Sequence, residues 1–202
     1  MDKIDHYFSA EPTTPSERSE IQVRVEGVDL NLLTDRGVFS GRQIDKGTAV
    51  LIRSMELPGE GRVLDLGCGY GVVGIAAAMR TPGTMVTLVD INARATELAG
   101  ENCRRAGVSN VEVLTGDVAQ VLDDRTFDVI LCNPPYRMGK KIVIGILSDA
   151  AHRLNPGGSL WIVGRTKQGI KTLARDISHL FATVETVRIK GGYRVVRLGI
   201  AG

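Results

Sequence analysis

The chain has 202 residues, a length typical of one domain, and 43% of them are hydrophobic and 24% charged. This balance excludes low-complexity disorder and collagen-like repeats, and no apolar run reaches the roughly 18 residues that a membrane span requires. The net charge is only +2, yet residues 165–202 hold eight basic and two acidic residues. This local surplus suits either an anionic partner or a solvated basic surface.

The cysteines and the N-terminal segment indicate the cellular compartment in which the protein works. Three cysteines, Cys68, Cys103 and Cys132, form no CxxC pair and are odd in number, which argues against a disulfide framework and against a metal site. The N-terminus lacks the apolar core of a signal peptide. We therefore expect a cytoplasmic protein without a bound metal or a membrane partner, and either a monomer or a weak dimer.

The N-terminal part is predicted to be irregular at first and then structured. Residues 1–20, with several Pro, Ser and Thr, predict an irregular arm, and residues 21–202 predict a single domain. Apolar and polar residues alternate around Glu26-Gly27, which indicates a β-hairpin. Asp45 can cap a short helix through Met55, before the cluster Pro58-Gly59-Glu60-Gly61 breaks the chain.

From residue 62 onward, strand-like and helical segments alternate. Strands are predicted at 62–66, 84–90, 111–115, 127–132 and 159–164, and helices at 72–80, 92–106, 118–122, 140–153 and 167–180. This alternation predicts a parallel sheet with right-handed crossovers. Two final strand-like runs, 182–189 and 193–200, flank Lys190-Gly191-Gly192 and predict an antiparallel hairpin that closes the sheet.

The turn after the first of these strands is rich in glycine and can be interpreted in two ways. Gly69, Gly71 and Gly74 satisfy the GxGxxG pattern of dinucleotide-binding proteins, and Asp90 follows about 20 residues later. However, Asp65 stands at the end of the strand, where its charge would repel a pyrophosphate. An acid at this point suits a cationic ligand such as S-adenosylmethionine, which carries an ammonium and a sulfonium group and no phosphate.

Three acids follow three successive predicted strands. Asp65, Asp90 and Asp117 would lie at the carboxyl edge of a parallel sheet, where ligands bind in such folds. Asp90 can accept both ribose hydroxyls, and Asp117 can accept from the adenine amino group. Each acid taken alone could instead be a helix cap or part of a solvated turn, but the set in register favours a cofactor site.

These residues carry a family resemblance. VLDLGCGYGVVGIAAA at 63–78, LVDIN at 88–92 and Gly116-Asp117 resemble the cofactor half of class I S-adenosylmethionine-dependent methyltransferases, over roughly residues 40–200. The resemblance implies an α/β, Rossmann-like fold with a mostly parallel seven-stranded sheet, a C-terminal antiparallel hairpin and helices on both faces. The cofactor-binding residues that it predicts are Asp65, Gly67, Gly69, Gly71, Asp90, Ile91, Asp117, Val118 and Asn133.

The fourth predicted strand of this series leads into Asn133-Pro134-Pro135-Tyr136, which we predict to be catalytic. Two prolines stiffen the loop. The side-chain oxygen of Asn133 and the carbonyl of Pro134 could accept both hydrogens of an –NH₂ group and aim its lone pair at the sulfonium methyl, which is catalysis by positioning. The ring of Tyr136 could stack on an extruded base, although four such residues could also form a plain proline-rich turn with Tyr136 as a packing residue.

The loop is similar to that of methyltransferases acting on amino groups of DNA adenine, RNA bases and protein glutamine. GVFSGRQIDKGTAVL at 37–51, the early HYFS and the closing GGYRVVRL resemble the small-subunit ribosomal RNA guanine-N2 methyltransferases and their single-domain archaeal-type relatives. That group usually carries phenylalanine at the position of Tyr136 and, in bacteria, an extra N-terminal domain. The resemblance implies transfer of a methyl group to an exocyclic amine, guanine N2 of ribosomal RNA.

Basic residues near the loop extend this prediction to the substrate. Arg137, Lys140 and Lys141 could neutralise phosphates beside a target nucleotide, together with the basic C-terminal segment. We therefore expect RNA, either ribosomal RNA or the small ribosomal subunit, as the partner. Protein glutamine methylation, a nicotinamide dehydrogenase and a catalytically silent RNA-binding module remain the alternatives.

Overall fold

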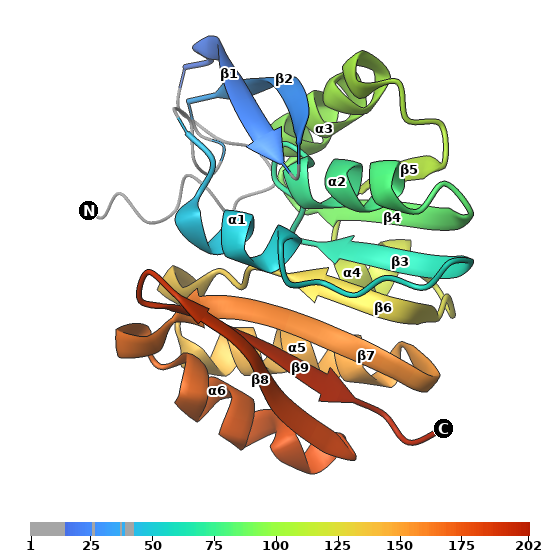
Figure 1. Cartoon of the computed structure of the whole chain (residues 1–202), viewed down its shortest axis with the longest axis vertical. Helices are drawn as coiled ribbons and strands as arrows, with labels where there is room; N and C mark the ends of the chain where they lie inside the picture. Colours follow the sequence, from blue (N-terminus) through green and yellow to red (C-terminus); the bar gives the residue numbers. More distant parts are fainter. Residues whose placement is uncertain (1–14, 26, 37, 39–42) are drawn as a thin grey trace.

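The computed structural model describes residues 15–25, 27–36, 38 and 43–202 (Figure 1). The N-terminal hairpin is confirmed, because β1 (Arg18–Val25) and β2 (Val28–Asp35) pair antiparallel. Its first strand begins at Arg18, so the end of the predicted arm is already ordered into the hairpin. The HYFS segment and Phe39-Ser40 lie outside the described residues.

A buried asparagine joins this hairpin to the rest of the molecule. Asn102, on the helix α3 (Ala93–Ala106), accepts from the backbone N–H of Leu33 at 2.7 Å and donates to the Leu33 carbonyl at 2.9 Å. It also donates to the carbonyl of Tyr70 at 2.9 Å. Its side chain therefore continues the hydrogen bonding of β2 and connects the hairpin with the glycine-rich loop.

The predicted short helix is also present. The helix α1 spans Lys46–Ile52, and the carboxylate of Asp45 accepts from the backbone N–H of Thr48 at 3.0 Å. The helix ends at Ile52, three residues earlier than Met55, which the sequence predicted as its last residue. The hydroxyl of Ser54 bonds the carbonyl of Val50, and such side-chain bonding competes with continuation of the helix.

The sheet confirms the predicted class of fold. Its strands are β3 (Gly61–Leu66), β4 (Thr84–Asp90), β5 (Val111–Thr115), β6 (Phe127–Cys132), β7 (Leu154–Arg165), β8 (Thr183–Lys190) and β9 (Tyr193–Gly199). They lie in the order β5-β4-β3-β6-β7-β9-β8, with the first five parallel. β9 runs antiparallel between β7 and β8, as the closing hairpin predicted.

Helices cover both faces of this sheet, because its residues alternate between two cores. Val63, Leu131 and Trp161 face α1, α3 and the helix α2 (Val72–Arg80), and the N-terminal hairpin joins the same core. Leu64 and Ile130 belong to the other core. Its helices are α4 (Val118–Val121), α5 (Lys140–His152) and α6 (Ile170–Ile177).

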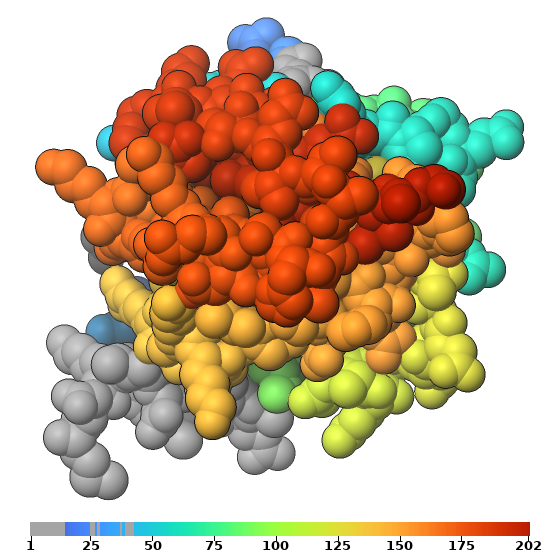
Figure 2. Space-filling model, turned by 90° about the horizontal axis from the view of Figure 1, so that it is seen from below, coloured from blue at the N-terminus to red at the C-terminus, as the bar shows by residue number. Residues whose placement is uncertain are grey.

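The prediction of one continuous helix over residues 167–180 is wrong. This segment is divided into a short 3₁₀ turn, α6 and a second 3₁₀ turn. Gly169 separates the first two with φ of +93°, a left-handed conformation that an α-helix does not contain. Seen from below Figure 1, α6 and the C-terminal strands form the orange and red surface, beside α5 in yellow-orange (Figure 2).

Two further observations concern the described residues as a set. Cys68, Cys103 and Cys132 are all free and buried, in agreement with the prediction that they form no disulfide framework. None of the helices in the described part of the chain is long and apolar enough to cross a membrane.

Candidate active site

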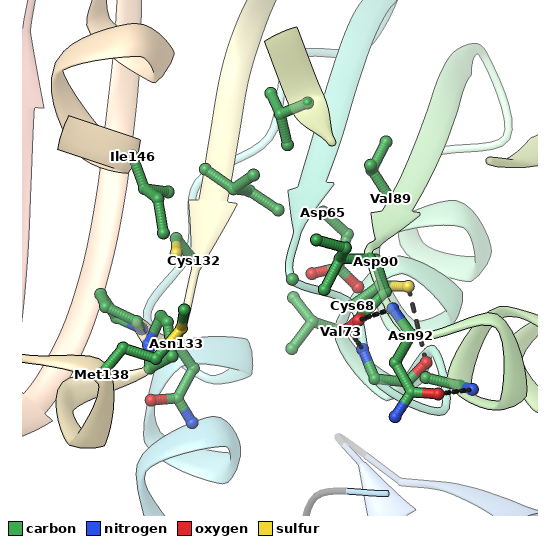
Figure 3. A pocket seen from close by; sticks show the side chains of 18 of the residues that line it. Asp65, Cys68, Val73, Val89, Asp90, Asn92, Cys132, Asn133, Met138 and Ile146 are labelled. Carbon is green, nitrogen blue, oxygen red and sulfur yellow. Dashed lines mark hydrogen bonds between the residues drawn. The ribbon is translucent and has the colours of Figure 1, made fainter. Parts of the chain in front are cut away.

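The candidate site lies where the order of the strands reverses. From β3 the chain proceeds outward to β4 and β5, and from β6 it proceeds outward on the other side to β7. The carboxyl ends of β3 and β6 therefore flank a topological switch point, the usual place for a ligand in such sheets. A cavity of about 330 Å³ opens there, between the turns after β3 to β6 and the helix α5 (Figure 3).

Most of the predicted site residues meet in this cavity, although they come from four different turns. The lining includes Asp65, Gly67, Gly69, Asp90, Ile91, Asp117, Val118, Asn133, Pro134 and Pro135. Outside the lining lie Gly71, Tyr136, Arg137, Lys140 and Lys141.

The glycine-rich loop turns sharply at the end of β3. Gly67, Gly69 and Gly71 have φ of +72°, +55° and +91°, a region that glycine adopts without strain. The backbone N–H groups of Gly67 and Cys68 both donate to the carbonyl of Val89, at 2.9 and 3.0 Å, which ties the loop to β4. Gly71 caps the N-terminus of α2, so its role here is to shape the loop and not to line the cavity.

Asp65 and Asp117 each serve a helix and the cavity at once. The buried carboxylate of Asp65 accepts from the backbone N–H of Gly74 in the first turn of α2, at 2.7 Å. Asp117 caps α4 by accepting from the N–H of Ala119 at 2.9 Å. The capping interpretation is thus correct for Asp117, whereas Asp65 bonds the first turn of α2 from outside the cap position, which is Gly71. In each acid one further carboxylate oxygen is left to bind a ligand.

Asp90 holds the glycine-rich loop in the same way. One carboxylate oxygen accepts from the N–H of Gly69 at 2.8 Å, and the other accepts from the N–H of Asn92 at 2.9 Å. Figure 3 shows this half-buried carboxylate next to the loop. A hydrogen bond from the backbone N–H of Ile91 also stabilises this carboxylate. The bidentate contact with a diol stays a prediction.

The lining of the cavity is anionic. Four of the described residues that line it are aspartates, Asp65, Asp90, Asp117 and Asp149, and none is Lys, Arg or His. Burial raises the pKa of Asp65 to about 7; the N–H of Gly74 opposes this shift and the neighbouring Asp90 adds to it. Burial also raises the pKa of Asp90. Two acids held in a buried position without a cation suit a positively charged ligand and disfavour a pyrophosphate.

On the other side of the switch point, the loop after β6 presents Asn133 and Pro134. The amide nitrogen of Asn133 donates to Thr48 Oγ1 at 3.0 Å and to Asp45 Oδ2 at 3.3 Å. The carbonyl of Pro134 accepts from the N–H of Tyr136 at 2.8 Å, which uses one of its two lone pairs. The side-chain oxygen of Asn133 and the carbonyl oxygen of Pro134 can therefore each still accept a hydrogen bond from a ligand.

Tyr136 is held by the sheet. Its hydroxyl donates to the carbonyl of Val163 in β7 at 3.0 Å, and its ring packs against the core beside α5 and α6. A Cβ at Gly164 would come within 2.0 Å of that hydroxyl, so the ring lies directly on the backbone of β7. The packing interpretation is therefore correct for Tyr136, and a stacking role for the ring stays a prediction.

The three basic residues after the loop are placed differently from one another. Lys140 forms an ion pair of 2.5 Å with Asp176 on α6, which the sequence pattern did not indicate. Arg137 and Lys141 are exposed and follow the Asn-Pro-Pro-Tyr loop closely in the sequence. The predicted phosphate-binding group is thus divided, because one of its members already has a carboxylate partner.

The basic residues of the C-terminal hairpin are also divided. Lys190 lies next to the turn whose Gly192 carbonyl accepts from Thr166, just beyond the carboxyl end of β7. Arg197 instead lies over the ring of Trp161, 5.7 Å from its centre, and pairs with Glu56 at 3.7 Å. The hollow that Arg197 lines shares no residue with the cavity. Arg197 of the basic C-terminal segment therefore lies away from the cavity.

Sequence reasoning missed several residues of the site. The hydroxyl of Thr48 and the side chains of Met138, Ile142 and Ile146 line the cavity. The segment 37–51, which carries part of the family resemblance, contains Asp45-Lys46-Gly47-Thr48 and so offered a signal for Thr48. From the sequence alone, this stretch predicted only the helix cap at Asp45. Among residues 15–25, 27–36, 38 and 43–202, no group of three or more His, Cys, Asp or Glu side chains is arranged to hold a metal ion.

This strand order, a glycine-rich loop after β3 and an Asn-Pro-Pro-Tyr loop after β6 define a Rossmann-like protein of the methyltransferase class. Comparison with protein families agrees: the model of the Methyltransferase small domain matches residues 29–197. The chain belongs to this family. Membership favours the methyltransferase interpretation of the glycine-rich loop over the dinucleotide interpretation.

Individual relatives extend over different parts of their own chains. The uncharacterized protein YbxB of Bacillus subtilis is 37% identical over 96% of this chain and 97% of its own length. The ribosomal RNA large subunit methyltransferase G of Pseudomonas syringae is 36% identical over 81% of this chain. The present chain spans only 45% of that relative.

A solved structure shares the fold. The 16S rRNA N2 methyltransferase of T. thermophilus, in complex with AdoMet and guanosine, superposes with a TM-score of 0.81. It is 24% identical to this chain, and the match covers 94% of this chain and 52% of that one.

Proposed function

We propose that this protein is an S-adenosylmethionine-dependent N-methyltransferase that acts on an exocyclic amino group of ribosomal RNA, guanine N2. The observation that carries the cofactor is the anionic cavity at the switch point, whose described lining residues include four aspartates and no basic residue. This donor set fits a ligand with an ammonium, a sulfonium and a ribose diol.

Three of these four acids have a proposed partner on the cofactor. Asp65 would bind the ammonium group, Asp90 the ribose hydroxyls and Asp117 the adenine amino group, with Ile91 and Val118 beside the base. The bound cofactor supplies a methyl group on a sulfonium. An ammonium next to Asp65 also offsets the burial that raises the pKa of this carboxyl to about 7.

The acceptor amine would be bound by Asn133 and Pro134. Their oxygen atoms each accept one N–H of the –NH₂ group, which directs the nitrogen lone pair along the line of transfer. An exocyclic amine is a weak nucleophile because its lone pair is conjugated with the ring. Holding both hydrogens out of plane localises that lone pair, so orientation and preorganised polar groups supply the catalysis.

The proposal of ribosomal RNA rests on the relatives and on the surface beside the loop. Two of the proteins to which this chain is similar are ribosomal RNA methyltransferases by name. Arg137 and Lys141 are exposed next to the loop and would contact phosphates that flank the target nucleotide. Guanine N2 is the acceptor that we propose from the likeness of residues 37–51 to the small-subunit enzymes.

The test is methyl transfer from tritiated S-adenosylmethionine to purified small and large ribosomal subunits, followed by nucleoside analysis of each ribosomal RNA. We expect the label in N2-methylguanosine, and about 10²- to 10³-fold slower labelling with the Asn133→Ala variant. Label in another methylated base would correct the acceptor and keep the reaction. Label in a protein glutamine, or cofactor binding without any transfer, would contradict the proposed substrate and favour the alternatives named above.

A further inference from the structure

The first turn of α1 contacts the acceptor loop directly, although 85 and 88 residues separate the two partners along the chain. Thr48 Oγ1 accepts one hydrogen bond from the amide nitrogen of Asn133, at 3.0 Å, and Asp45 Oδ2 accepts another, at 3.3 Å. An amide nitrogen carries two hydrogens, and both are used here. The oxygen of Asn133 is therefore the atom left to meet a ligand.

This turn is itself held rigidly. Asp45 Oδ2 accepts from the backbone N–H of Thr48 at 3.0 Å, so the same carboxylate oxygen caps α1 and binds Asn133. A Cβ at Gly47 would lie 2.8 Å from that oxygen and 2.8 Å from the ring of Tyr193. The buried ring of Tyr193, whose hydroxyl accepts from Arg165 Nε at 3.1 Å, therefore packs on the backbone of the turn.

We propose that Asp45, Gly47 and Thr48 form a positioning cradle, which fixes the amide of Asn133 with its oxygen toward the acceptor amine. This inference rests on the proposed function. An amide that turned by 180° would present its own N–H groups to the –NH₂ of the substrate, and two donors do not bond each other. The cradle disfavours that orientation, because it would place the amide oxygen of Asn133 against the carboxylate of Asp45, and two acceptors do not bond each other.

The cradle gives each residue type in this stretch a physical reason. The carboxylate of Asp45 accepts from Thr48 and Asn133, Gly47 leaves room for Tyr193, and Thr48 lines the cavity and accepts from Asn133. Supporting groups that hold a catalytic side chain within a narrow range of orientations are what preorganised sites require. Asp45, Gly47 and Thr48 are positioning residues, since they act on the substrate through Asn133.

The first experiment compares two substitutions at one position. Thr48→Val removes the hydroxyl and keeps the size, and we expect the turnover number to fall about 3- to 10-fold, the effect of one lost neutral hydrogen bond. The affinity for S-adenosylmethionine, measured by calorimetry, should stay unchanged, and Thr48→Ser should restore turnover. In an Asn133→Ala background, Thr48→Val should cause no further loss, because its effect passes through Asn133.

A glycine pair provides a second variant with a matched control. Gly47→Ala places a methyl group against Asp45 and Tyr193 and should lower turnover without weakening cofactor binding. Gly145→Ala, in the helix α5, adds a methyl group where nothing lies within 4 Å, and it should leave turnover unchanged. Equal turnover in the two variants would contradict the cradle.

A spectroscopic readout separates this inference from the proposed function. The side-chain amide protons of Asn133, assigned by their loss in Asn133→Ala, should shift in Thr48→Val and stay close to their wild-type positions in Thr48→Ser. If the wild-type protein transfers no methyl group, the proposed function fails, and this spectrum alone decides the cradle. Unshifted amide protons, or a Thr48→Val effect of equal size in the Asn133→Ala background, would overturn it.

Discussion

The two sides of the cavity differ in how far apart in the sequence their hydrogen-bond partners lie. On the cofactor side, Asp65 and Asp117 bond backbone groups nine and two residues further on, and Asp90 bonds one group two residues further on and one 21 residues back. On the acceptor side, Asn133 is held by residues 85 and 88 positions away. The cofactor side is therefore built from turns at the ends of adjacent strands, whereas the acceptor side forms only when α1 packs on β7 and β9 and reaches the loop after β6.

This difference has a consequence for substitutions. Substitutions at Asp45 and Thr48, which contact the acceptor loop from far away in the sequence, should change turnover without changing cofactor binding. Substitutions on the cofactor side should instead change binding with little effect on turnover at saturating cofactor. The following predictions test that separation.

The largest effect is expected at the acceptor loop. Asn133→Ala should lower turnover about 10²- to 10³-fold, by analogy with the loss of one preorganised polar group at a reacting centre. Its affinity for S-adenosylmethionine should stay within a few fold, because the amide is directed mainly at the acceptor. Asn155→Ala, which removes a bond to Asp128 away from the cavity, serves as the matched control. Near-normal turnover of Asn133→Ala would show that the loop is only structural.

The next effect is expected on cofactor affinity. Asp90→Ala should weaken binding of S-adenosylmethionine by about 1.5–3 kcal/mol, the scale of lost hydrogen bonds to a charged group. Part of this loss would come from the loop, since the N–H of Gly69 loses its acceptor. Titration calorimetry measures the change. Tighter binding of NAD than of S-adenosylmethionine by the wild-type protein would contradict the assignment of the cavity.

A pH dependence should follow from Asp65, whose pKa burial raises from 3.8 to about 7. An ammonium group binds the ionised carboxylate, so cofactor affinity should fall as the pH drops below 7, by up to about tenfold per pH unit. The Asp65→Asn variant should bind weakly at every pH and without this slope. A wild-type affinity that is constant between pH 5.5 and 8 would contradict the role of Asp65.

The stability of the ligand-free protein should change in the opposite sense. Because the folded state holds the Asp65 proton to a higher pH than the unfolded state, ionisation disfavours folding. The contribution of this group to the free energy of unfolding is complete below pH 3.8 and is lost as the pH rises toward 7. Thermal unfolding of wild type and Asp65→Asn across this range should show the variant gaining relative stability with rising pH.

The smallest effect distinguishes the two lysines at the start of α5. Lys141→Gln should raise the apparent KM for RNA and reduce the salt dependence of binding by about 0.7 log units per log unit of salt, as expected for one phosphate contact on a single strand. Lys140→Gln should change that slope less, because Lys140 already pairs with Asp176. Equal slopes for the two variants would show that the ion pair does not restrain Lys140 when RNA binds.

The sequence by itself determined the alternation of strands and helices, the closing hairpin and the cofactor side of the cavity. These features depend on residues that are near one another in the chain. The glycine-rich loop follows its strand directly, and Asp90 and Asp117 each bond a backbone N–H two residues further on. Local periodicity and capping chemistry predict such features, because their geometry is set within a few residues.

Only the tertiary structure decided what surrounds the acceptor loop. Tyr136 is fixed by the carbonyl of Val163 on the neighbouring strand, and Lys140 is paired with Asp176 on α6. Arg197 is held over Trp161, away from the cavity, although its charge belongs to the basic segment. The orientation of Asn133 comes from the first turn of α1, which Tyr193 packs against. No periodic pattern reports these contacts, because they join elements that become neighbours only when both faces of the sheet are packed.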